Sequence, residues 1–488
     1  MESKLEPMNL LVLMSDEHNP KMLGCAGHPL ARTPHLDALA ARGTRFEAAY
    51  TTCPICVPAR ASFATGRYVH QIGYWDNSMG YDGRVKSWGH RLQEHRIPSE
   101  SIGKLHYRNE RDDTGFDRQQ IPMHIKDGVG MVHLSIRGQF PDFVPVLSTS
   151  GIIGEAGPGE SEYTAYDRRV GELACKWLAR RARDAGRPWV LFVSFVTPHY
   201  PLIAPDRFFE QYPLADMPLP KCDVRGGFEP HPWLALSVAT SNAAGYDDDA
   251  HRRALAAYLG LVSFTDDQIG QVLAALDRSG LAERTRVLYT SDHGENAGAR
   301  GLWGKSNHYE EASGIPLVLA GADIPEGRVS RTPVTLADAF PTILEATGIP
   351  ASEADRDLPG TSLIQIANGP EGPERVAFSE YHAARSPSGS FMIRKGRYKY
   401  IEYVGYEPEL FDLASDPEEI RDLAGRPAYA ATVASMQQAL RGIVEPEAAD
   451  RAANDAQKTL VEQRGGPRKV MEDRVTRKHY TPVPDGIL

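Results

Sequence analysis

Long apolar runs and cysteine pairs are scarce in this chain of 488 residues. The early apolar run from Asn9 to Met14 is too short for a signal-peptide core or a membrane span, and Asp16 and Glu17 follow it at once. Five cysteines are an odd number and too few for a disulfide framework. These absences predict a cytoplasmic protein without a membrane segment.

An excess of basic residues is also missing. The 54 Lys and Arg against 64 Asp and Glu leave a formal net charge of −10, which argues against general nucleic-acid binding. An anionic substrate would therefore need a local cationic pocket. The composition, 41% hydrophobic and 24% charged, is ordinary for a globular enzyme, and the length predicts one large domain and a smaller one.

Three buried strands are predicted, and each leads into a polar cluster. The runs at 9–14, 189–196 and 286–291 are continuous and apolar, which is typical of strands covered on both faces. Apolar residues recur at helical spacing over 166–184 and 251–279. Strands alternating with helices predict an α/β fold with a mainly parallel central sheet flanked by helices. Ligands bind at the carboxyl ends of such strands, where these clusters should lie.

The remaining segments indicate a lid and a second domain. Residues 107–161, rich in Gly, Pro and charge, predict a long loop or lid, and 367–376 predict a linker. Beyond it, 391–404 and 409–413 suggest a small antiparallel sheet. The predicted units are an α/β catalytic domain, 1–372, and a smaller C-terminal α+β domain with an extended tail, 373–488.

The stretch Cys53-Pro54-Ile55-Cys56 allows several interpretations. A thiol-disulfide motif needs its nucleophilic cysteine near a helix N-terminus, and Pro58 is a good first helical residue, which brings Cys56 nearer the positive end. A zinc site needs about four ligands, and no second close cysteine pair exists. Two buried structural cysteines are the plain alternative.

The surrounding residues add a more specific pattern. Cys-x-Pro-x-Arg at 56–60, followed by Thr-Gly-Arg at 65–67, resembles the signature of the formylglycine-dependent sulfatases, in which a separate enzyme oxidises the cysteine to an aldehyde. The resemblance continues through "PHLDALAARGTRFEAAY", "GKLHY", "TPHYP", "YTSDHGE", "LWGKSNHYEEASGIPLV" and "ELFDLASDPEE". It implies an alkaline-phosphatase-like α/β domain with a smaller C-terminal domain.

The resemblance also implies one divalent cation. Asp16, Asp292 and His293 offer hard oxygen ligands and one nitrogen, which suit Ca²⁺ first, and also Mn²⁺ or Mg²⁺. The formylglycine made from Cys56 would bind the same cation. Glu17 stands where many family members have a second carboxylate or an amide, so we include it among the predicted ligands, with a side chain turned away as the alternative.

A sulfate monoester resists nucleophilic attack, so the site must neutralise charge, supply a strong nucleophile and protonate the departing oxygen. The resemblance implies that one hydroxyl of the hydrated formylglycine attacks sulfur and that deprotonation of the other expels sulfate. Lys104 and His106 are expected to alternate along a strand and point the same way. The resemblance implies that Arg60 hydrogen-bonds the diol and that Lys104 binds sulfate. It places His106 beside the second hydroxyl of the diol, which must be deprotonated. His199 and Lys305 would together bind sulfate and protonate the leaving oxygen.

Two further residues are predicted to contact the substrate. Asn77 resembles an asparagine that contacts sulfate in related enzymes, and Glu380 matches a region where some relatives recognise the organic part of the substrate. A turn residue and the start of a strand are their structural alternatives.

The tail at 468–488 cannot build its own core. One hypothesis places it across a neighbouring subunit with His479 or Tyr480 in the pocket, and a free exposed end is the alternative. Oligomeric state is not readable from the chain, and a homo-oligomer stays open.

The leading interpretation is a metal-dependent sulfuric ester hydrolase that matures through a formylglycine-generating enzyme and releases inorganic sulfate and an alcohol from a small or sugar-linked ester. Choline sulfate is one such substrate. A phosphonate monoester or phosphodiester hydrolase with the same nucleophile is the enzymatic alternative. A thiol-redox or inactive metal-binding protein, in which Cys56 stays unmodified, is the non-enzymatic one.

Overall fold

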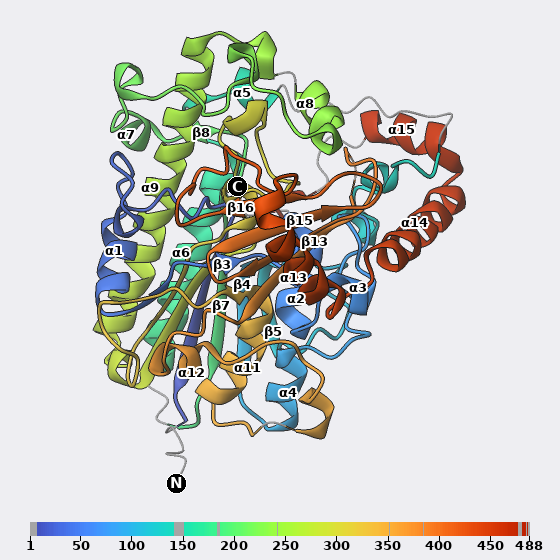
Figure 1. The fold of residues 1–488 in the computed structure, drawn as a ribbon. Helices are drawn as coiled ribbons and strands as arrows, with labels where there is room; N and C mark the ends of the chain where they lie inside the picture. Colours follow the sequence, from blue (N-terminus) through green and yellow to red (C-terminus); the bar gives the residue numbers. More distant parts are fainter. Residues whose placement is uncertain are drawn as a thin grey trace.

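A large central sheet with helices on both faces dominates the computed structural model, and a smaller sheet lies beside it (Figure 1). The described residues are 7–140, 151–182, 186–241, 243–350, 352–383, 385–476, 481–484 and 486. Among the helices of these segments, none combines the length and the apolar character that a membrane span requires.

The central sheet has eight strands in the order β11-β2-β10-β9-β1-β7-β4-β5. Its strands are β1 (Asn9–Asp16), β2 (Gly43–Phe46), β4 (Ser99–Lys104), β5 (Arg118–Met123), β7 (Val190–Pro198), β9 (Thr285–Ser291), β10 (Leu317–Ala320) and β11 (Arg328–Ser330). Strand β10 runs antiparallel to both of its neighbours, and the other pairings of this sheet are parallel. The three predicted buried strands are therefore confirmed as the adjacent trio β9, β1 and β7.

Helices cover both faces of this sheet (Figure 1). One face carries α1 (Pro34–Ala41), α6 (Glu162–Arg181) and α9 (Asp248–Arg278), and the other carries α2 (Cys56–Thr65), α4 (Trp88–Glu94) and α11 (Ala339–Ala346). Shorter elements are β3 (Ala49–Tyr50), β6 (Gly157–Pro158), β8 (Ile203–Ala204), β12 (Val334–Thr335), α3 (Val69–Ile72), α5 (Gly151–Gly154), α7 (Asp206–Phe209), α8 (Ala235–Ser241), α10 (Glu310–Ser313) and α12 (Leu363–Asn368).

Strand β1 has no solvent-facing side because both of its faces enter a core. Leu11 and Leu13 belong to the cluster beneath α6 and α9. Leu10 and Val12 point the other way and belong to the cluster that includes Phe63 of α2. Successive side chains of a strand alternate between faces, so a continuous apolar run is what a strand between two helical layers requires.

The two predicted helices are confirmed, with ends explained by local capping. Helix α6 begins at Glu162 because Ser161 accepts a hydrogen bond from the backbone N–H of Thr164. Helix α9 ends at Arg278, and Gly280 follows with a φ of 71°. Glycine adopts this left-handed conformation without steric cost, which makes it a regular helix stop.

The prediction of a loop or lid over 107–161 needs correction. Residues 118–123 form β5, which pairs with β4 and adds an eighth strand at one edge of the sheet. Its exposed edge gives it little apolar pattern, so periodicity alone does not reveal it. Residues 141–150 of this segment lie outside the described part of the chain.

The C-terminal region forms the expected antiparallel sheet. Its strands are β13 (Val376–Tyr381), β14 (Ser390–Lys395), β15 (Tyr398–Tyr403) and β16 (Glu409–Asp412), followed by α13 (Ala430–Arg441), α14 (Pro446–Gln463) and α15 (Gly466–Thr476). Helix α13 packs on this sheet through Met436 and Leu440. Between α12 and β13 the chain has no regular element, as expected for a linker. The boundary at 372 stays a prediction.

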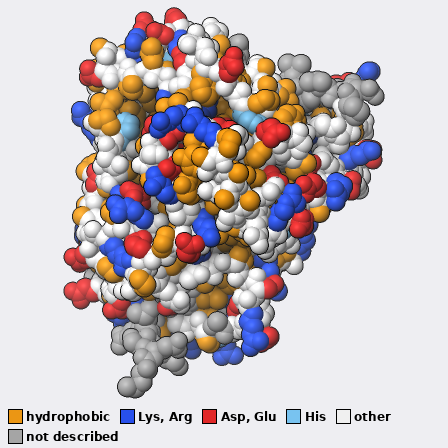
Figure 2. Space-filling view, in the orientation of Figure 1, with side chains coloured by type: hydrophobic (Ala, Val, Ile, Leu, Met, Phe, Trp, Pro, Cys, Tyr) orange, Lys and Arg blue, Asp and Glu red, His pale blue; other side chains and the backbone are white. Residues whose placement is uncertain are grey.

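Acidic and basic side chains are mixed over the face shown in Figure 2. Neither sign forms a continuous expanse on that face, in keeping with a modest formal net charge of −10 over 488 residues. A binding site for a charged ligand must therefore carry its own local charge.

Asp167 of α6 holds the carboxyl end of β7 in place. Its carboxylate accepts hydrogen bonds from the backbone N–H groups of Val196 at 2.8 Å and Thr197 at 2.7 Å. We expect Asp167→Ala to lower the free energy of unfolding by about 1–3 kcal/mol, because it leaves buried donors without partners. Urea denaturation measures this. The exposed Glu172→Ala of the same helix should stay within about 0.5 kcal/mol, and equal losses in both variants would contradict the assignment.

Candidate active site

Polar side chains gather where the central strands of the large sheet end. Asp16 is the last residue of β1, Lys104 the last of β4, and His199 follows β7. Asp292 and His293 follow β9. Because these four strands are parallel neighbours, their carboxyl ends meet at one edge, and the prediction that the polar clusters meet there is confirmed.

Helix α2 brings Cys56 to the same edge. Cys56 is the first residue of this helix, and the backbone N–H of the next residue, Val57, donates to Asn77 Oδ1 at 3.0 Å. Pro58 lies in the first turn, where a missing N–H costs nothing. The helix thus presents its positive end to the cluster. Asn77 supports the helix start, and its contact with substrate stays a prediction.

Arg60, one helical turn after Cys56, ties the strands to the helix. Its Nε lies 2.7 Å from Asp292 Oδ2, and its Nη2 lies 3.0 Å from Asp16 Oδ2. Its Nη1 donates to the backbone oxygen of Lys104 at 2.7 Å and to Ser194 Oγ at 2.9 Å. One buried guanidinium therefore joins four strands to α2. Ser194 was not predicted from the sequence, although it is a polar residue inside an apolar run.

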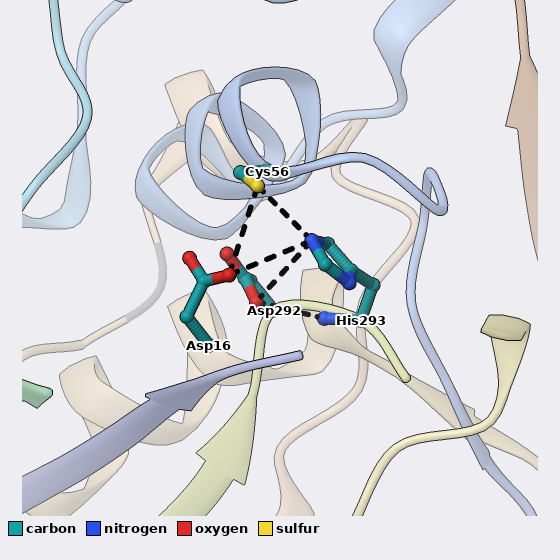
Figure 3. A group of neighbouring side chains, drawn as sticks. All are labelled: Asp16, Cys56, Asp292 and His293. Carbon is teal, nitrogen blue, oxygen red and sulfur yellow. Dashed lines mark hydrogen bonds and ion pairs between the residues drawn. The ribbon is translucent and has the colours of Figure 1, made fainter. Parts of the chain in front are cut away.

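Four side chains converge on one point (Figure 3). Cys56 Sγ lies 3.1 Å from His293 Nε2 and 3.7 Å from Asp16 Oδ1. His293 Nε2 lies 3.8 Å from Asp16 Oδ1 and 3.7 Å from Asp292 Oδ1. These ligand atoms all lie within 4.8 Å of one another, close enough to share one metal ion.

The hydrogen bonds of His293 and of the two aspartates show which of their atoms point to the shared metal-binding position. His293 Nδ1 lies 3.0 Å from the Gly294 carbonyl oxygen, which can only accept, so Nδ1 carries the proton and Nε2 offers its lone pair. The Oδ2 atoms of Asp16 and Asp292 are occupied by Arg60, and their Oδ1 atoms face His293. Two carboxylate oxygens and one imidazole nitrogen form a donor set that fits a divalent cation.

Asp16 remains ionised despite complete burial. Burial alone would raise the pKa of Asp16, but the charges of Lys104, with Nζ at 2.7 Å, and of Arg60 outweigh it and hold this pKa well below its usual value. Because Asp16 is ionised, its carboxylate can act as a ligand for a cation.

The two neighbouring cysteines are poor thiolates. Burial, with a contribution from Asp16, raises the pKa of Cys56 to about 12. Burial also raises the pKa of Cys53 well above its usual value. Both are free cysteines. Reactive redox cysteines need a lowered thiol pKa, so this environment disfavours the thiol-redox interpretation.

A second group surrounds Lys305, whose Nζ lies 2.7 Å from Glu17 Oε2 and 2.9 Å from His199 Nε2. His199 Nδ1 lies 2.6 Å from the Tyr200 carbonyl oxygen, so Nδ1 carries the proton and Nε2 accepts from Lys305. Burial and the charge of Lys305 lower the pKa of His199 well below its usual value. Burial opposes the charge on Lys305, but neighbouring groups that include Glu17 outweigh it and raise its pKa.

Glu17 lies between the two groups. Burial raises its pKa, Lys305 opposes this, and the nearby Glu295 adds to it. Glu17 can form a metal-binding group with Asp16 and His199, and its direct contacts are with Lys305 and His199. Its role as a ligand stays a prediction.

His106 reaches the site in a way that corrects the expected strand geometry. Strand β4 ends at Lys104, and His106 lies beyond it with a φ of 59°. The two residues therefore do not alternate along one strand. His106 is buried, which together with Lys104 lowers its pKa well below the usual value, so its ring is neutral. Its Nε2 lies 2.8 Å from Thr481 Oγ1, a contact that no sequence pattern indicates.

Glu380 lies in the buried base of the C-terminal sheet, on β13. Its Oε1 accepts from His70 Nδ1 at 2.9 Å and its Oε2 lies 2.9 Å from His382 Nε2. Burial opposes ionisation, but His70 and His382 outweigh it and lower the pKa of Glu380 to about 2. The carboxylate is thus fully engaged within the protein, and contact with substrate stays a prediction.

Two tyrosines that the sequence did not single out stand beside His199. The ring centroids of Tyr200 and His199 are 4.2 Å apart, and those of Tyr163 and His199 are 6.1 Å apart. Lys305 Nζ lies 5.0 Å from the centre of the Tyr200 ring, within the range of a cation–π interaction. Tyrosine alone carries too little positional signal to be predicted here, because aromatic residues are common in cores.

The sulfatase family model matches residues 8–349, and the model described as N-sulphoglucosamine sulphohydrolase, C-terminal, matches residues 298–445. The chain belongs to the sulfatase family and is a sulfuric ester hydrolase. The family generally uses a metal ion and formylglycine, and the cluster around Asp16 contains residues able to hold a metal.

The chain is similar along nearly its whole length to a choline-sulfatase from Rhizobium meliloti (strain 1021), with 31% identity over 92% of this chain and 89% of that protein. It is 27% identical to arylsulfatase K from Bos taurus over 89% of this chain and 81% of the relative. The phosphonate monoester hydrolase of Agrobacterium radiobacter has the same fold, with a TM-score of 0.72, 24% identity, and coverage of 89% of this chain and 95% of that one.

Glu380 offers a test that separates stability from substrate binding. Its folded pKa is depressed, so its stabilising effect is present above the unfolded pKa near 4.5 and is lost as the pH falls from there towards about 2. At neutral pH, Glu380→Gln should lower the free energy of unfolding by about 1–3 kcal/mol, and the gap from the parent protein should narrow in acid. Urea unfolding at several pH values measures this.

The exposed Glu374→Gln, at the loop before β13, is the matched control and should leave the free energy of unfolding within about 0.5 kcal/mol. A raised KM for Glu380→Gln with unchanged stability would instead support the predicted contact with substrate.

Proposed function

We propose that this sulfatase hydrolyses small sulfate monoesters with a formylglycine nucleophile made from Cys56 and held against one divalent cation. The observation that carries the proposal is the convergence of Cys56 Sγ, Asp16 Oδ1, Asp292 Oδ1 and His293 Nε2 within 4.8 Å at the positive end of α2. Similarity to a choline-sulfatase supports a small alkyl ester, with choline sulfate as the first candidate.

Asp16, Asp292 and His293 would hold the cation, with Ca²⁺ as the preferred ion. The cation would neutralise charge on the sulfate group, and hydrated formylglycine would supply two hydroxyls on one carbon, one for attack on sulfur and one whose deprotonation expels sulfate. The raised pKa of Cys56 disfavours its use as a thiolate, and the match to the sulfatase family supports its conversion to formylglycine. A formylglycine-generating enzyme is therefore the maturation partner.

Lys305 is the proton donor for the leaving alcohol. Its raised pKa keeps the ammonium protonated, whereas His199 is neutral and its Nε2 lone pair already accepts from Lys305. In this arrangement Lys305 Nζ has a proton to give and His199 can help to hold Nζ in place. Glu17 Oε2, at 2.7 Å, balances the positive charge.

Lys104 and His106 act on the sulfate group, in its binding and in its later release. The Lys104 ammonium, 2.7 Å from Asp16 Oδ2, places a positive charge beside the position that sulfate would occupy. His106 is buried and neutral, so its ring can accept a proton when sulfate departs.

The nucleophile and the cation can be tested together. After co-expression with a formylglycine-generating enzyme, a peptide containing residue 56 should carry an aldehyde, and Cys56→Ala should lose activity by about 10³-fold or more. Asp292→Asn should also lose activity and contain less bound metal by elemental analysis, because it removes a charged ligand. Cys53→Ala is the control and should keep both aldehyde and activity. Full activity in Cys56→Ala would refute the proposal.

The proton donor can be identified from the leaving group. Lys305→Ala should slow hydrolysis of an alkyl sulfate by about 10²–10⁴-fold and that of a nitrophenyl sulfate much less, because a good leaving group departs without a proton. His199→Ala should slow both esters by similar factors. Steady-state kcat/KM values for a series of leaving groups measure this. The reverse pattern would assign the acid to His199.

The substrate class is tested with one panel of esters. Choline sulfate, an aryl sulfate, sulfated sugars and an aryl phosphonate should be compared with Asp292→Asn as the background control. We expect the highest kcat/KM for a small sulfate ester. A higher value for the aryl phosphonate would favour the phosphonate monoester hydrolase that shares this nucleophile.

A further inference from the structure

We propose that Thr481, in the C-terminal tail of the same chain, is a positioning residue for His106. This inference rests on the proposed function, in which His106 accepts the proton as sulfate departs. Thr481 lies 375 positions from His106 in the sequence, and its Oγ1 is 2.8 Å from His106 Nε2. Only 8% of Thr481 is exposed, so the contact is buried.

Two further contacts hold this part of the tail at the site. The carbonyl oxygen of Thr481 accepts from the hydroxyl of Tyr163 at 3.4 Å, and Tyr163 belongs to α6 with its ring beside His199. Val483 packs against the apolar cluster beneath α6 and α9. The predicted roles of His479 and Tyr480 concern residues outside the described part of the chain.

The hydrogen bond determines which nitrogen of His106 can act as a base. Within the described segments, His106 Nδ1 is buried and has no hydrogen-bond partner. If Nε2–H donates to Thr481 Oγ1, the lone pair remains on Nδ1 and is free to accept a proton. In this tautomer the ring N–H has a partner, and among the described residues the Nδ1 lone pair has none.

The backbone alone cannot hold the ring in this orientation. The N–H of His106 donates to the Met123 carbonyl oxygen at 2.8 Å, which fixes the backbone in its left-handed conformation at φ 59°. The ring can still rotate about its own side-chain bonds. Thr481 supplies a hydrogen bond that restrains the orientation of the ring. The proton is assigned to Nε2 because Nδ1 has no partner among the described residues, whereas the hydroxyl can donate or accept.

Two substitutions separate the hydroxyl from the shape of the side chain. Thr481→Val removes the hydroxyl and keeps the volume, and Thr481→Ser keeps the hydroxyl. We expect Thr481→Val to lower kcat for the alkyl sulfate by about 10–100-fold, as for loss of other groups that orient a functional histidine. KM should fall with kcat and kcat/KM should change little, because the slowed step comes after alcohol release. Thr481→Ser should retain most of the activity. Exposed Thr459→Val of α14 is the matched control and should behave as the parent protein.

The time course of alcohol release shows which step of the reaction Thr481→Val slows. If proton acceptance by His106 becomes slow, the alcohol should be released in a rapid first turnover, followed by slower steady-state release in Thr481→Val. Loss of alcohol release in the first turnover as well would place the defect before the proton transfer and would overturn the inference. Equal activity of Thr481→Val and the parent protein, or equal loss in Thr481→Val and Thr481→Ser, would overturn it too.

A measurement that needs no turnover keeps this test independent of the proposed function. The ¹⁵N chemical shifts of the His106 ring, assigned with His106→Gln, report which nitrogen carries the proton. In the parent protein the proton should lie on Nε2, and Thr481→Val should change the tautomer population. Unchanged shifts would refute the contact. A parent protein with the expected shifts that hydrolyses no sulfate ester would refute the proposed function alone.

Discussion

The guanidinium of Arg60 is the interaction on which the site depends. It contacts Asp16, Asp292, Ser194 and the backbone of Lys104, and so joins the ends of four adjacent strands to the helix that carries Cys56. A charge buried to this extent is costly unless each of its donors is paired. Here each carboxylate pairs with Arg60 through Oδ2 and turns Oδ1 towards the shared metal-binding point, where Asp292 Oδ1 also accepts from the backbone N–H groups of Glu17 and His293. The same side chain thus stabilises the fold and orients the ligands.

Charge is divided between two neighbouring groups at this edge. The first contains Asp16, Asp292 and His293, in which the two carboxylates are balanced by the positive charges of Arg60 and Lys104. The second contains Glu17, His199 and Lys305, in which the ammonium is the one group with a proton ready for transfer. In the proposed mechanism, a cation held by the first group and a proton donor in the second would polarise the ester on one side and protonate it on the other. The burial of both groups strengthens each of these interactions.

The C-terminal sheet and tail serve the site from outside the large sheet. Glu380 and its histidine partners lie behind the loop that leads into α2, where the backbone N–H of Glu380 donates to the carbonyl oxygen of Thr52. The contact of Thr481 with His106 comes from the opposite end of the chain. The smaller sheet and the tail thus contact the loop before α2 and the ring of His106, the groups to which the proposed mechanism assigns the nucleophile and the base.

The sequence alone determined the α/β fold, the three central strands, the C-terminal antiparallel sheet and the family, because apolar runs and short motifs record local burial and local chemistry. It also indicated Asp16, Asp292 and His293 as one group, since parallel strands end at one edge. Tertiary structure alone decided the remaining features: β5 at the sheet edge, the turn that carries His106 beyond its strand, the burial of Glu380, and the approach of Thr481 to His106. These depend on pairings between residues far apart in the chain, and such contacts leave no periodic or spacing signal in a single sequence.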